Sequence, residues 1–264
     1  VPGFVNAHCH LELSHMKGVI NSNTVDGLPG FIDEIISKRD FPDNLQEKIF
    51  KADREMRQNG IVAVGDISNT DDTFNIKAES DIYYHTFIEV FAVSNKASGD
   101  IFKNAEENFK KCDEKNISCS IVPHAAYSVP VALQEMIKKF NKEDSLIISV
   151  HNQETPSEDE MIQNKNGKLA DVLKKKGFLF DDFNFKHDTV LKTNLSFLKS
   201  TDNILLIHNT FSKENDIEFA EQFSDNTYWV LCPLSNLYIE KKLPDVNLFL
   251  NKDVKVCLGT DSYT

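Results

Sequence analysis

Short apolar segments alternate along this chain with longer segments of helical periodicity. Eight segments have the β-branched and apolar composition of strands, at residues 4–7, 61–67, 83–90, 118–123, 146–150, 204–207, 228–231 and 254–258. Between them, apolar residues recur at i, i+3 and i+4 in segments 45–59, 101–115, 131–141, 169–176, 213–223 and 246–251. Repeated strand–helix units require parallel strands with right-handed crossovers, and eight of them close most naturally into a barrel. The pattern therefore predicts an α/β fold, specifically a (β/α)8 TIM barrel.

The length of the chain agrees with this fold but does not decide it. A chain of 264 residues fits one barrel domain, residues 1–264, as well as two ordinary domains. An open doubly wound sheet is the alternative architecture, although no Gly-x-Gly-x-x-Gly or Gly-x-x-x-x-Gly-Lys follows a predicted strand. Strand-like segments lie close to both ends, after Val1 and before Thr264, so we expect a domain truncated at both ends.

Composition and charge restrict the class of partner. The formal net charge of -12 disfavours nucleic acid and anionic membranes as main partners, because both would be repelled over most of the surface. No apolar run approaches the roughly 20 residues needed to span a bilayer. The five cysteines are an odd number without Cys-x-x-Cys spacing, which indicates neither disulfides nor a thiolate zinc site. We expect a cytoplasmic protein that acts on a small-molecule substrate.

Ionisable side chains gather where the predicted strands end. Of the eight histidines, only His15, His85 and His187 fall outside these positions. Active-site groups of barrels of this type lie at the carboxyl ends of the strands, and imidazole with carboxylate suits zinc or iron better than calcium or magnesium. A shared metal site is the hypothesis that explains the pattern. The residues are His8, His10 and Glu12 after the first strand, Asp66 after the second, Glu89 at the third, His124 at the fourth, His151 and Glu154 at the fifth, His208 at the sixth and Asp261 at the eighth.

Each of these residues also has a purely structural interpretation. His124 or His208 could bond a backbone carbonyl, Asp261 could cap a helix, and Glu154 could be a charge at a helix N-terminus. Their joint occurrence favours the metal site, because a buried carboxylate or imidazole is costly without a partner. For Asp66, in Val64-Gly65-Asp66, we prefer the structural interpretation of a strand that ends in a turn. The role of Glu12 stays open.

Five segments of the sequence resemble a known family. They are Pro2-Gly3-Phe4-Val5-Asn6-Ala7-His8-Cys9-His10-Leu11-Glu12, Pro123-His124-Ala125-Ala126-Tyr127-Ser128, His151-Asn152-Gln153-Glu154-Thr155, Cys232-Pro233-Leu234-Ser235-Asn236 and Leu258-Gly259-Thr260-Asp261-Ser262. In order and spacing they are similar to the amidohydrolase superfamily, in its branch of cytosine, guanine and S-adenosylhomocysteine deaminases and triazine hydrolases. The resemblance implies a (β/α)8 barrel with one divalent metal ion, Zn2+ before Fe2+, held by residues matching His8, His10, His151 and Asp261.

The same resemblance implies the catalytic roles. Glu154 would shuttle protons, and His208 would hold the attacking water or the developing oxyanion. Independently, a divalent metal lowers the pKa of water toward about 7, Asp261 can accept a proton during attack, and Glu154 can donate one to the leaving amine. The segment Ile121-Val122-Pro123-His124 lacks the lysine of two-metal relatives, so we expect one metal. His124, Glu89 and Glu12 are the expected substrate-binding residues.

The chain departs from the family pattern in several places. Ala126 stands where many relatives have proline, and Leu234 stands where many have arginine, which would remove a charged contact. The flanking β-sandwich and the last helix of the family are not apparent in this sequence.

The leading functional hypothesis is a metal-dependent hydrolase, acting on carbon–nitrogen bonds other than peptide bonds, that deaminates an aminated heterocycle such as a nucleobase or nucleoside derivative. The alternatives are an amidohydrolase acting on a cyclic amide or another C–N or C–Cl bond, and a catalytically inactive barrel that only binds a ligand. By analogy with the family, the protein is a possible homodimer.

Overall fold

Eight parallel strands form the centre of the computed structural model, which describes residues 2–21, 23, 25–39, 42–142 and 145–262. Val1 and Thr264, at the two predicted truncation points, lie outside these residues. The first four strands form one sheet in the order β1-β2-β3-β4, and the last four form a second in the order β5-β6-β7-β8. The strands are β1 (Phe4–Cys9), β2 (Ile61–Ser68), β3 (Tyr83–Val90), β4 (Ser118–Pro123), β5 (Ile147–Asn152), β6 (Asn203–His208), β7 (Thr227–Leu231) and β8 (Lys255–Leu258).

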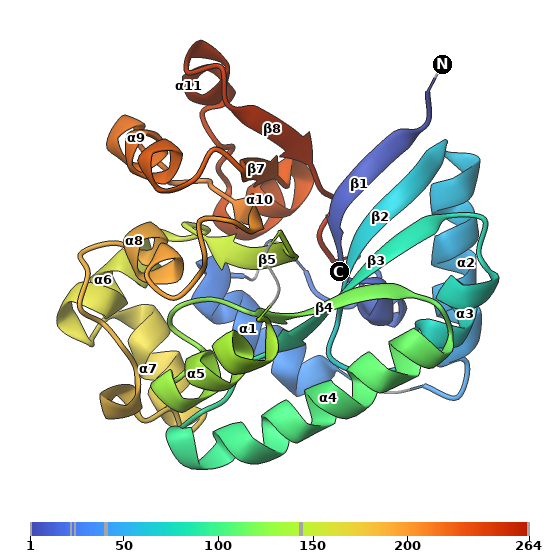
Figure 1. The fold of residues 1–264 in the computed structure, drawn as a ribbon, viewed down its shortest axis with the longest axis horizontal. Helices are drawn as coiled ribbons and strands as arrows, with labels where there is room; N and C mark the ends of the chain where they lie inside the picture. The colour runs from blue at the N-terminus through green and yellow to red at the C-terminus, as the bar shows by residue number, and fades with distance from the viewer. Residues whose placement is uncertain (1, 22, 24, 40–41, 143–144, 263–264) are drawn as a thin grey trace.

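The two sheets meet along both edges, mainly at their carboxyl ends (Figure 1). Between β4 and β5, the His151 amide donates to the His124 carbonyl at 2.8 Å. Between β8 and β1, Cys9 and Asp261 form an isolated parallel bridge. This closure gives the arrangement of a (β/α)8 barrel and excludes the open doubly wound alternative, in which the outer strands would not meet.

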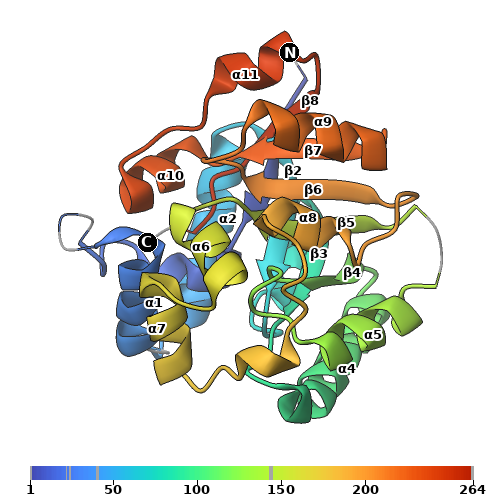
Figure 2. The same cartoon turned by 90° about the vertical axis from the view of Figure 1, so that its left-hand side faces the viewer.

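Helices cover the outer side of both sheets (Figure 2). All six predicted helical segments are present with ends shifted by at most three residues. The helices are α1 (Gly27–Lys38), α2 (Leu45–Gln58), α3 (Phe74–Glu79), α4 (Ser98–Glu114), α5 (Val131–Phe140), α6 (Pro156–Asn164), α7 (Lys168–Lys175), α8 (Val190–Leu195), α9 (Glu214–Phe223), α10 (Pro233–Glu240) and α11 (Val246–Asn251), with short 3-10 helices η1 (Leu11–Met16), η2 (Asn95–Ala97) and η3 (Phe180–Asp182).

Alternation along the strands separates two apolar layers. Ile67, Phe87 and Val122 point inward and pack together inside the barrel with Leu205. Neighbouring strand residues point outward, where Val64 and Tyr84 pack against α2. A strand that is apolar on both faces is the expected pattern for a parallel sheet covered by helices. This alternation decides which polar residues reach the mouth of the barrel.

One strand differs from its prediction in a way that matters for the site. β2 continues through Asp66 to Ser68, so the predicted turn at Asp66 is wrong. Gly65 permits this continuation, because a Cβ there would lie 2.6 Å from the Ala7 carbonyl oxygen on β1. Asp66 is therefore a fully buried residue in the middle of a strand.

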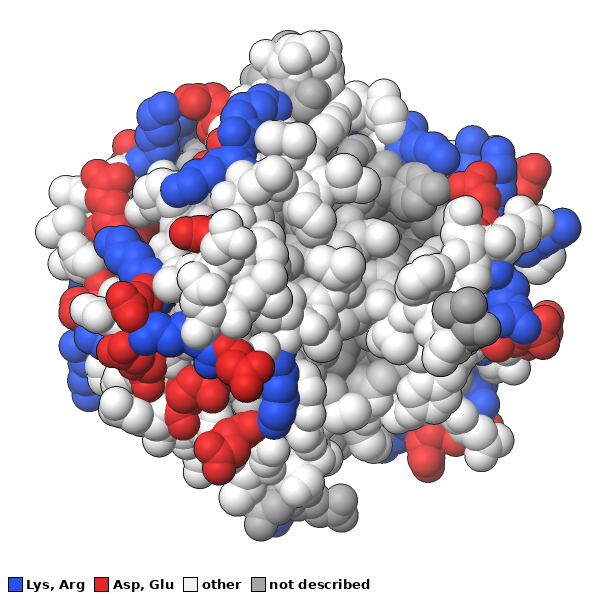
Figure 3. All heavy atoms as spheres, turned by 90° about the horizontal axis from the view of Figure 1, so that it is seen from above, with Lys and Arg blue, Asp and Glu red and all other residues white. Residues whose placement is uncertain are grey.

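The opposite end of the barrel, where the strands begin, carries little charge. The face seen in Figure 3, on the side of the N-terminus, has few charged side chains at its centre and gathers them at its periphery. A cavity of about 390 Å3 lies there among mainly apolar residues, including Val5, Ala63 and Leu205. Among the described residues, no helix is long and apolar enough to cross a membrane.

The segment 178–188, which is rich in Phe and Asp, contains only the short η3 helix. Phe178, Phe180 and Phe185 pack against Tyr127 and Leu169. The segment is therefore a loop whose aromatic side chains fill space between α7 and the loop that follows β4.

Candidate metal centre and active site

Residues near the start and near the end of the chain lie close together at the carboxyl ends of the strands. His8 lies on β1 and His10 directly after it, and the alternation of the strand turns both imidazoles inward while Cys9 points outward. Asp261 follows β8, and its amide donates to the His8 carbonyl at 3.0 Å. The Nε2 atoms of His8 and His10 each lie 3.3 Å from Asp261 Oδ1. A single carboxylate oxygen thus faces two imidazole nitrogens.

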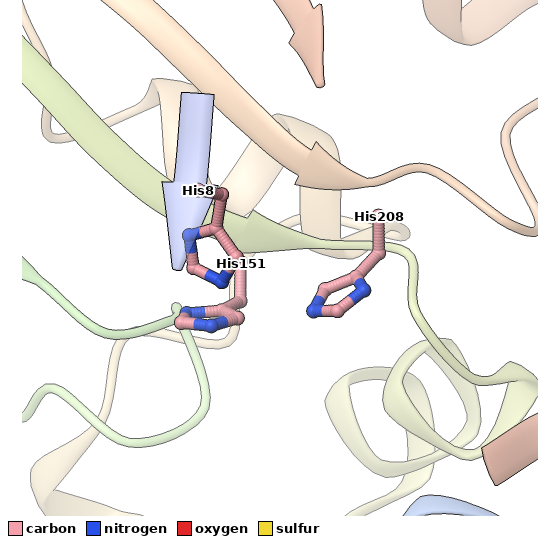
Figure 4. Close-up of side chains that lie close together, drawn as sticks. All are labelled: His8, His151 and His208. Carbon is pink, nitrogen blue, oxygen red and sulfur yellow. The ribbon is translucent and has the colours of Figure 1, made fainter. Parts of the chain in front are cut away.

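Two more histidines complete this group from the second sheet. His151 lies near the end of β5, with its ring centroid 5.0 Å from that of His8, and His208 lies at the end of β6, 5.9 Å from His8. Figure 4 shows the three imidazoles turned toward one another. One ligand atom from each of His8, His151 and His208 lies within 4.8 Å of the others, and the same holds for His8, His10 and Asp261.

The chemistry of this group fits a divalent metal. His8 is fully buried, yet neither of its ring nitrogens has a hydrogen-bond partner in the described structure. Burial, above all other effects, lowers the pKa of His8 to about 3, so its imidazole is neutral and offers a lone pair. A buried polar atom without a partner is costly. A metal ion held by His8, His10, His151 and Asp261 would give one of the two His8 nitrogens a partner, and these nitrogen and oxygen ligands are the kind that zinc and iron accept.

Glu89 lies directly behind His151. Its Oε1 is 3.3 Å from His151 Nδ1, and that nitrogen is also 3.1 Å from the His124 carbonyl oxygen. Burial opposes charge on His151, but the carboxylates of Glu89, Glu154 and Asp261, with Glu89 first, together raise the pKa of His151 to about 9. Acceptors at Nδ1 orient the ring so that Nε2 faces the metal site. A metal held by Nε2 would take the place of the second proton of this ring, while the proton on Nδ1 would stay with Glu89.

Asp261 is held as a charged carboxylate. Although burial favours its neutral form, the surrounding histidines, with His8 first, hold the pKa of Asp261 well below its ordinary value. Ser235 Oγ donates a short hydrogen bond to its Oδ2. Asp261 has a positive φ of 60°, which is uncommon for a residue with a side chain. This backbone conformation directs the carboxylate back toward His8 and His10.

Glu154 and His208 form the other side of the group. Glu154 Oε2 lies 3.6 Å from His208 Nε2. Burial, followed by the negative charge of Asp261, raises the pKa of Glu154 to about 8, so its carboxyl group holds a proton at neutral pH. His208 Nδ1 lies 2.9 Å from Asn236 Oδ1, and burial lowers the pKa of His208 to about 4. A neutral imidazole therefore faces a protonated carboxyl group.

The three predicted substrate-binding residues occupy different positions. His124 and Glu89 line a cavity of about 180 Å3 in front of the metal-ligand group. Glu12 does not line it in the described structure, because its carboxylate contacts Arg39 at 3.1 Å and accepts the Asn69 amide at 2.9 Å. Arg39 itself lines the cavity. Glu12 thus reaches the cavity indirectly, through Arg39 and Asn69, which both line it.

Several residues of the cavity were not predicted. Helix α1 supplies an apolar wall with Leu28, Phe31, Ile32 and Ile35, and Arg39 follows it. Helix α1 has no clear periodic signal, since Gly27 and Gly30 together with Pro29 weaken its helical pattern. Asn236 and Ser235 belong to a quoted motif of the resemblance, which could have indicated their contacts with His208 and Asp261.

The fold and this group of side chains define a class of protein: a (β/α)8 barrel with histidine and carboxylate side chains suited to a divalent metal at the carboxyl ends of its strands. The sequence profile described as "Amidohydrolase family" matches residues 1–263. The chain belongs to the amidohydrolase family, which confirms the resemblance drawn from the sequence motifs.

Curated relatives match nearly all of this chain. A protein named adenosine deaminase, from Helicobacter pylori, is 24% identical over 270 residues, which cover 99% of this chain and 63% of the relative. An aminodeoxyfutalosine deaminase from Nitratiruptor sp. is 24% identical over 266 residues, covering 99% and 62%. The chain thus spans less than two thirds of the length of these relatives.

Solved structures share the fold. Helicobacter pylori aminofutalosine deaminase in complex with methylthio-coformycin superposes with a TM-score of 0.82 at 23% identity, covering 99% of this chain and 63% of the other. Guanine deaminase from C. acetobutylicum, with bound guanine, gives 0.76 at 19% identity, covering 99% and 61%. These similarities confirm the barrel fold.

Proposed function

We propose that this protein is a metal-dependent hydrolase that deaminates an aminated heterocycle, with a nucleobase or purine nucleoside derivative as the substrate class. The observation that carries the proposal is the placement of the protonated carboxyl group of Glu154 beside His208, in the cavity that His10, His151 and Asp261 also line. Curated relatives named as deaminases of adenosine-type nucleosides support the same reaction. Zn2+ is the proposed metal, in line with a zinc-bound adenosine deaminase structure of the same fold.

The residues of the chain suit the stages of such a reaction. When bound, the metal supplies Lewis acidity that favours ionisation of water at neutral pH. Asp261, kept as a carboxylate by the surrounding histidines, accepts the proton of the attacking water. Glu154 carries a proton near neutral pH and donates it to the ring nitrogen. It then takes the proton of the hydroxyl group added from water and passes it to the leaving amine, and the proton held by Asp261 restores the Glu154 carboxyl group. His208, whose Nε2 faces Glu154 and the cavity, orients the water or the developing oxyanion.

The cavity supports a flat substrate with one apolar side. Phe31, Ile32 and Ile35 from α1 form an apolar wall, while Arg39 and Asn69 contribute polar groups on the same cavity. A heterocycle that places its amino group beside Glu154 would direct its substituent toward this wall and these polar groups. His124 lies where it can contact the ring, since it lines the cavity beside His151.

The test is ammonia release by the metal-loaded protein across a panel of aminated purines, pyrimidines, pterins, triazines and adenosyl compounds. Release from one subset, with adenosine-type compounds first, is the expected result. Silence across the panel with metal bound would contradict deamination and favour a cyclic amide or another C–N or C–Cl bond. Silence without bound metal would instead leave the ligand-binding barrel as the better interpretation.

Two further parts of the proposal have their own measurements. The cytoplasmic location agrees with five free cysteines among the described residues, and fractionation of cells would test it. The proposed homodimer is tested by sedimentation of the metal-loaded protein, and a single monomeric species would contradict it.

A further inference from the structure

A buried charged cluster lies on the outer side of the barrel, directly behind the β1 metal ligands. We name it the Lys77 cluster, and it comprises Lys77, Asp66, Ser68 and Thr86. Lys77 Nζ lies 2.6 Å from Asp66 Oδ2, and both side chains are fully buried. The ammonium group also donates to Ser68 Oγ at 2.9 Å and to Thr86 Oγ1 at 3.0 Å. Its three N–H bonds therefore all have acceptors.

The second oxygen of Asp66 connects this cluster to the metal-binding segment. Asp66 Oδ1 accepts the backbone amide of Leu11 at 2.7 Å. That amide belongs to the peptide that joins His10 to Leu11, where the chain changes from β1 to the η1 helix. It is one of the first amides of a helical turn, which have no partner within the helix itself. Asp66 thus supplies the acceptor that fixes the peptide directly after His10.

The opposite side of β1 is fixed by different contacts. The His8 carbonyl accepts the amides of Thr260 at 2.9 Å and Asp261 at 3.0 Å. In the register of the sheet, Cys9 pairs with Asp66 on β2 and bridges Asp261 after β8. The ligand pair His8 and His10 is consequently held from β8 on one side and, through Leu11, from β2 on the other.

The energetics favour a positioning role over a purely stabilising one. A buried ion pair loses the hydration of both charges, and apolar residues of similar size are often as stable or more so. What an apolar pair cannot supply is an acceptor for the Leu11 amide. Without one, the buried amide would have to turn away or admit water. Either change moves the peptide that sets the direction of His10.

We infer that Asp66, held by Lys77, is a positioning residue for the ligand pair His8 and His10, an inference that rests on the proposed metal site. Lys77 keeps the carboxylate paired and oriented, and Asp66 keeps the His10–Leu11 peptide in place. No member of the Lys77 cluster belongs to the groups of candidate metal ligands found among the described residues, so its effect reaches the site through the backbone of β1.

Two double variants separate the acceptor from the charge. Asp66→Asn with Lys77→Met removes both charges but leaves an amide oxygen that can accept the Leu11 amide. Asp66→Leu with Lys77→Met removes the charges and the acceptor together. Asp53→Leu is the matched control, because Asp53 lies buried in the same outer layer and accepts hydrogen bonds from Ser80 and Tyr84 but none from β1.

Zn2+ affinity is measured by competition with a chelator, and the visible spectrum of bound Co2+ reports ligand geometry. Removing an indirect support of a metal site typically weakens metal binding about 10- to 100-fold. We expect this loss and an altered Co2+ spectrum for the Leu variant. The Asn variant should bind like the wild type, and Asp53→Leu should lose stability without losing affinity. Circular dichroism confirms that each variant is folded.

The inference is overturned if the folded Leu variant binds Zn2+ like the wild type, or if the Asn variant loses as much affinity as the Leu variant. If the Leu variant does not fold, Asp66→Ser with Lys77→Met takes its place, since a serine hydroxyl is too short to reach the Leu11 amide. A wild-type protein that binds no Zn2+ would contradict the proposed function instead, which keeps the two failures apart.

Discussion

The inner and outer sides of β1 bury polar groups in opposite ways. On the inner side, both ring nitrogens of His8 lack hydrogen-bond partners among the described residues. On the outer side, behind Cys9, every N–H bond of Lys77 has an acceptor within the Lys77 cluster, and both carboxylate oxygens of Asp66 have partners. A scaffold completes its own hydrogen bonds, whereas a ligand site leaves donor atoms available. The difference indicates that the His8 side of β1 is the ligand site and that the Lys77 cluster is part of the scaffold.

Removal of the metal should give the largest effect and tests the inner side directly. We expect chelation to reduce ammonia release to background and readdition of Zn2+ to restore it, because the water then loses its activation. Zn2+ at 100 times its Kd should stabilise the folded protein by about 2.7 kcal/mol, which scanning calorimetry can measure. Full turnover in the presence of a strong chelator, with no metal remaining by elemental analysis, would contradict the metal site.

Glu154→Gln should remove turnover while sparing the metal. General acid–base catalysis contributes about 10^2- to 10^4-fold, and we expect kcat to fall by that amount because an amide cannot transfer the proton. Glu154 is not among the groups that place ligand atoms close together, so Zn2+ affinity should be unchanged. A variant with the wild-type kcat would show that another group moves the protons.

Glu89→Gln should affect metal binding more than chemistry. Glu89 contacts His151 Nδ1 and so helps to hold the His151 ring in one orientation. Because the uncharged Gln would hold the ring less firmly, we expect about 10- to 100-fold lower Zn2+ affinity. Glu12→Gln is the control, since the carboxylate of Glu12 is equally buried and its hydrogen bonds among the described residues go to Arg39, Asn69 and Thr70 rather than to a histidine. Equal affinities in the two variants would mean that Glu89 does not orient His151.

The pKa of Glu154 sets an expected pH dependence. Its pKa is raised to about 8, mainly by burial and then by the charge of Asp261. The proton-donating form is therefore present below pH 8 and is lost as the pH rises through this value. We expect kcat to fall by about tenfold per pH unit well above pH 8. A flat profile up to pH 10 would place the essential proton elsewhere.

The sequence predicted the barrel because strand and helix periods are local properties. All eight strands and six of the helices follow from apolar spacing, and the ends of β3 and β4 agree to the residue. Helices α1, α3, α6, α8 and α10 were missed, since three of them have only six to eight residues and α1 and α6 begin with glycine or proline. Their formation depends on packing against the sheets, which single-sequence periodicity does not contain.

The candidate site was predictable to the extent that it follows strand ends. The structure brings His8, His10, His151, His208 and Asp261 together, as the strand register implies. Arg39 could not be predicted, because it lies at the end of a missed helix and reaches the cavity through tertiary contacts. Asp66 was taken for a turn because Val64-Gly65-Asp66 resembles one, and only the distant Lys77 explains a buried carboxylate within β2. Long-range pairings of this kind leave no periodic signal.

Leu234→Arg should have the smallest effect on Zn2+ affinity and kcat/KM. It tests whether side chains of α10 that point away from the site contribute to it. The sequence motif indicates that an arginine at this position would make a charged contact. The Leu234 side chain, however, is 77% exposed and is not among the described residues that line the cavity. Its neighbours Ser235 and Asn236 contact Asp261 and His208, respectively. Exposed substitutions usually change stability by less than about 0.5 kcal/mol, so we expect unchanged Zn2+ affinity and kcat/KM. Asn236→Leu is the contrasting change on the same helix, because it removes the acceptor for His208 Nδ1, and kcat should fall while Zn2+ affinity is retained. If Leu234→Arg altered kcat/KM as strongly as Asn236→Leu does, the outward face of α10 would belong to the substrate site, and contact with the buried histidines would no longer separate the two kinds of residue.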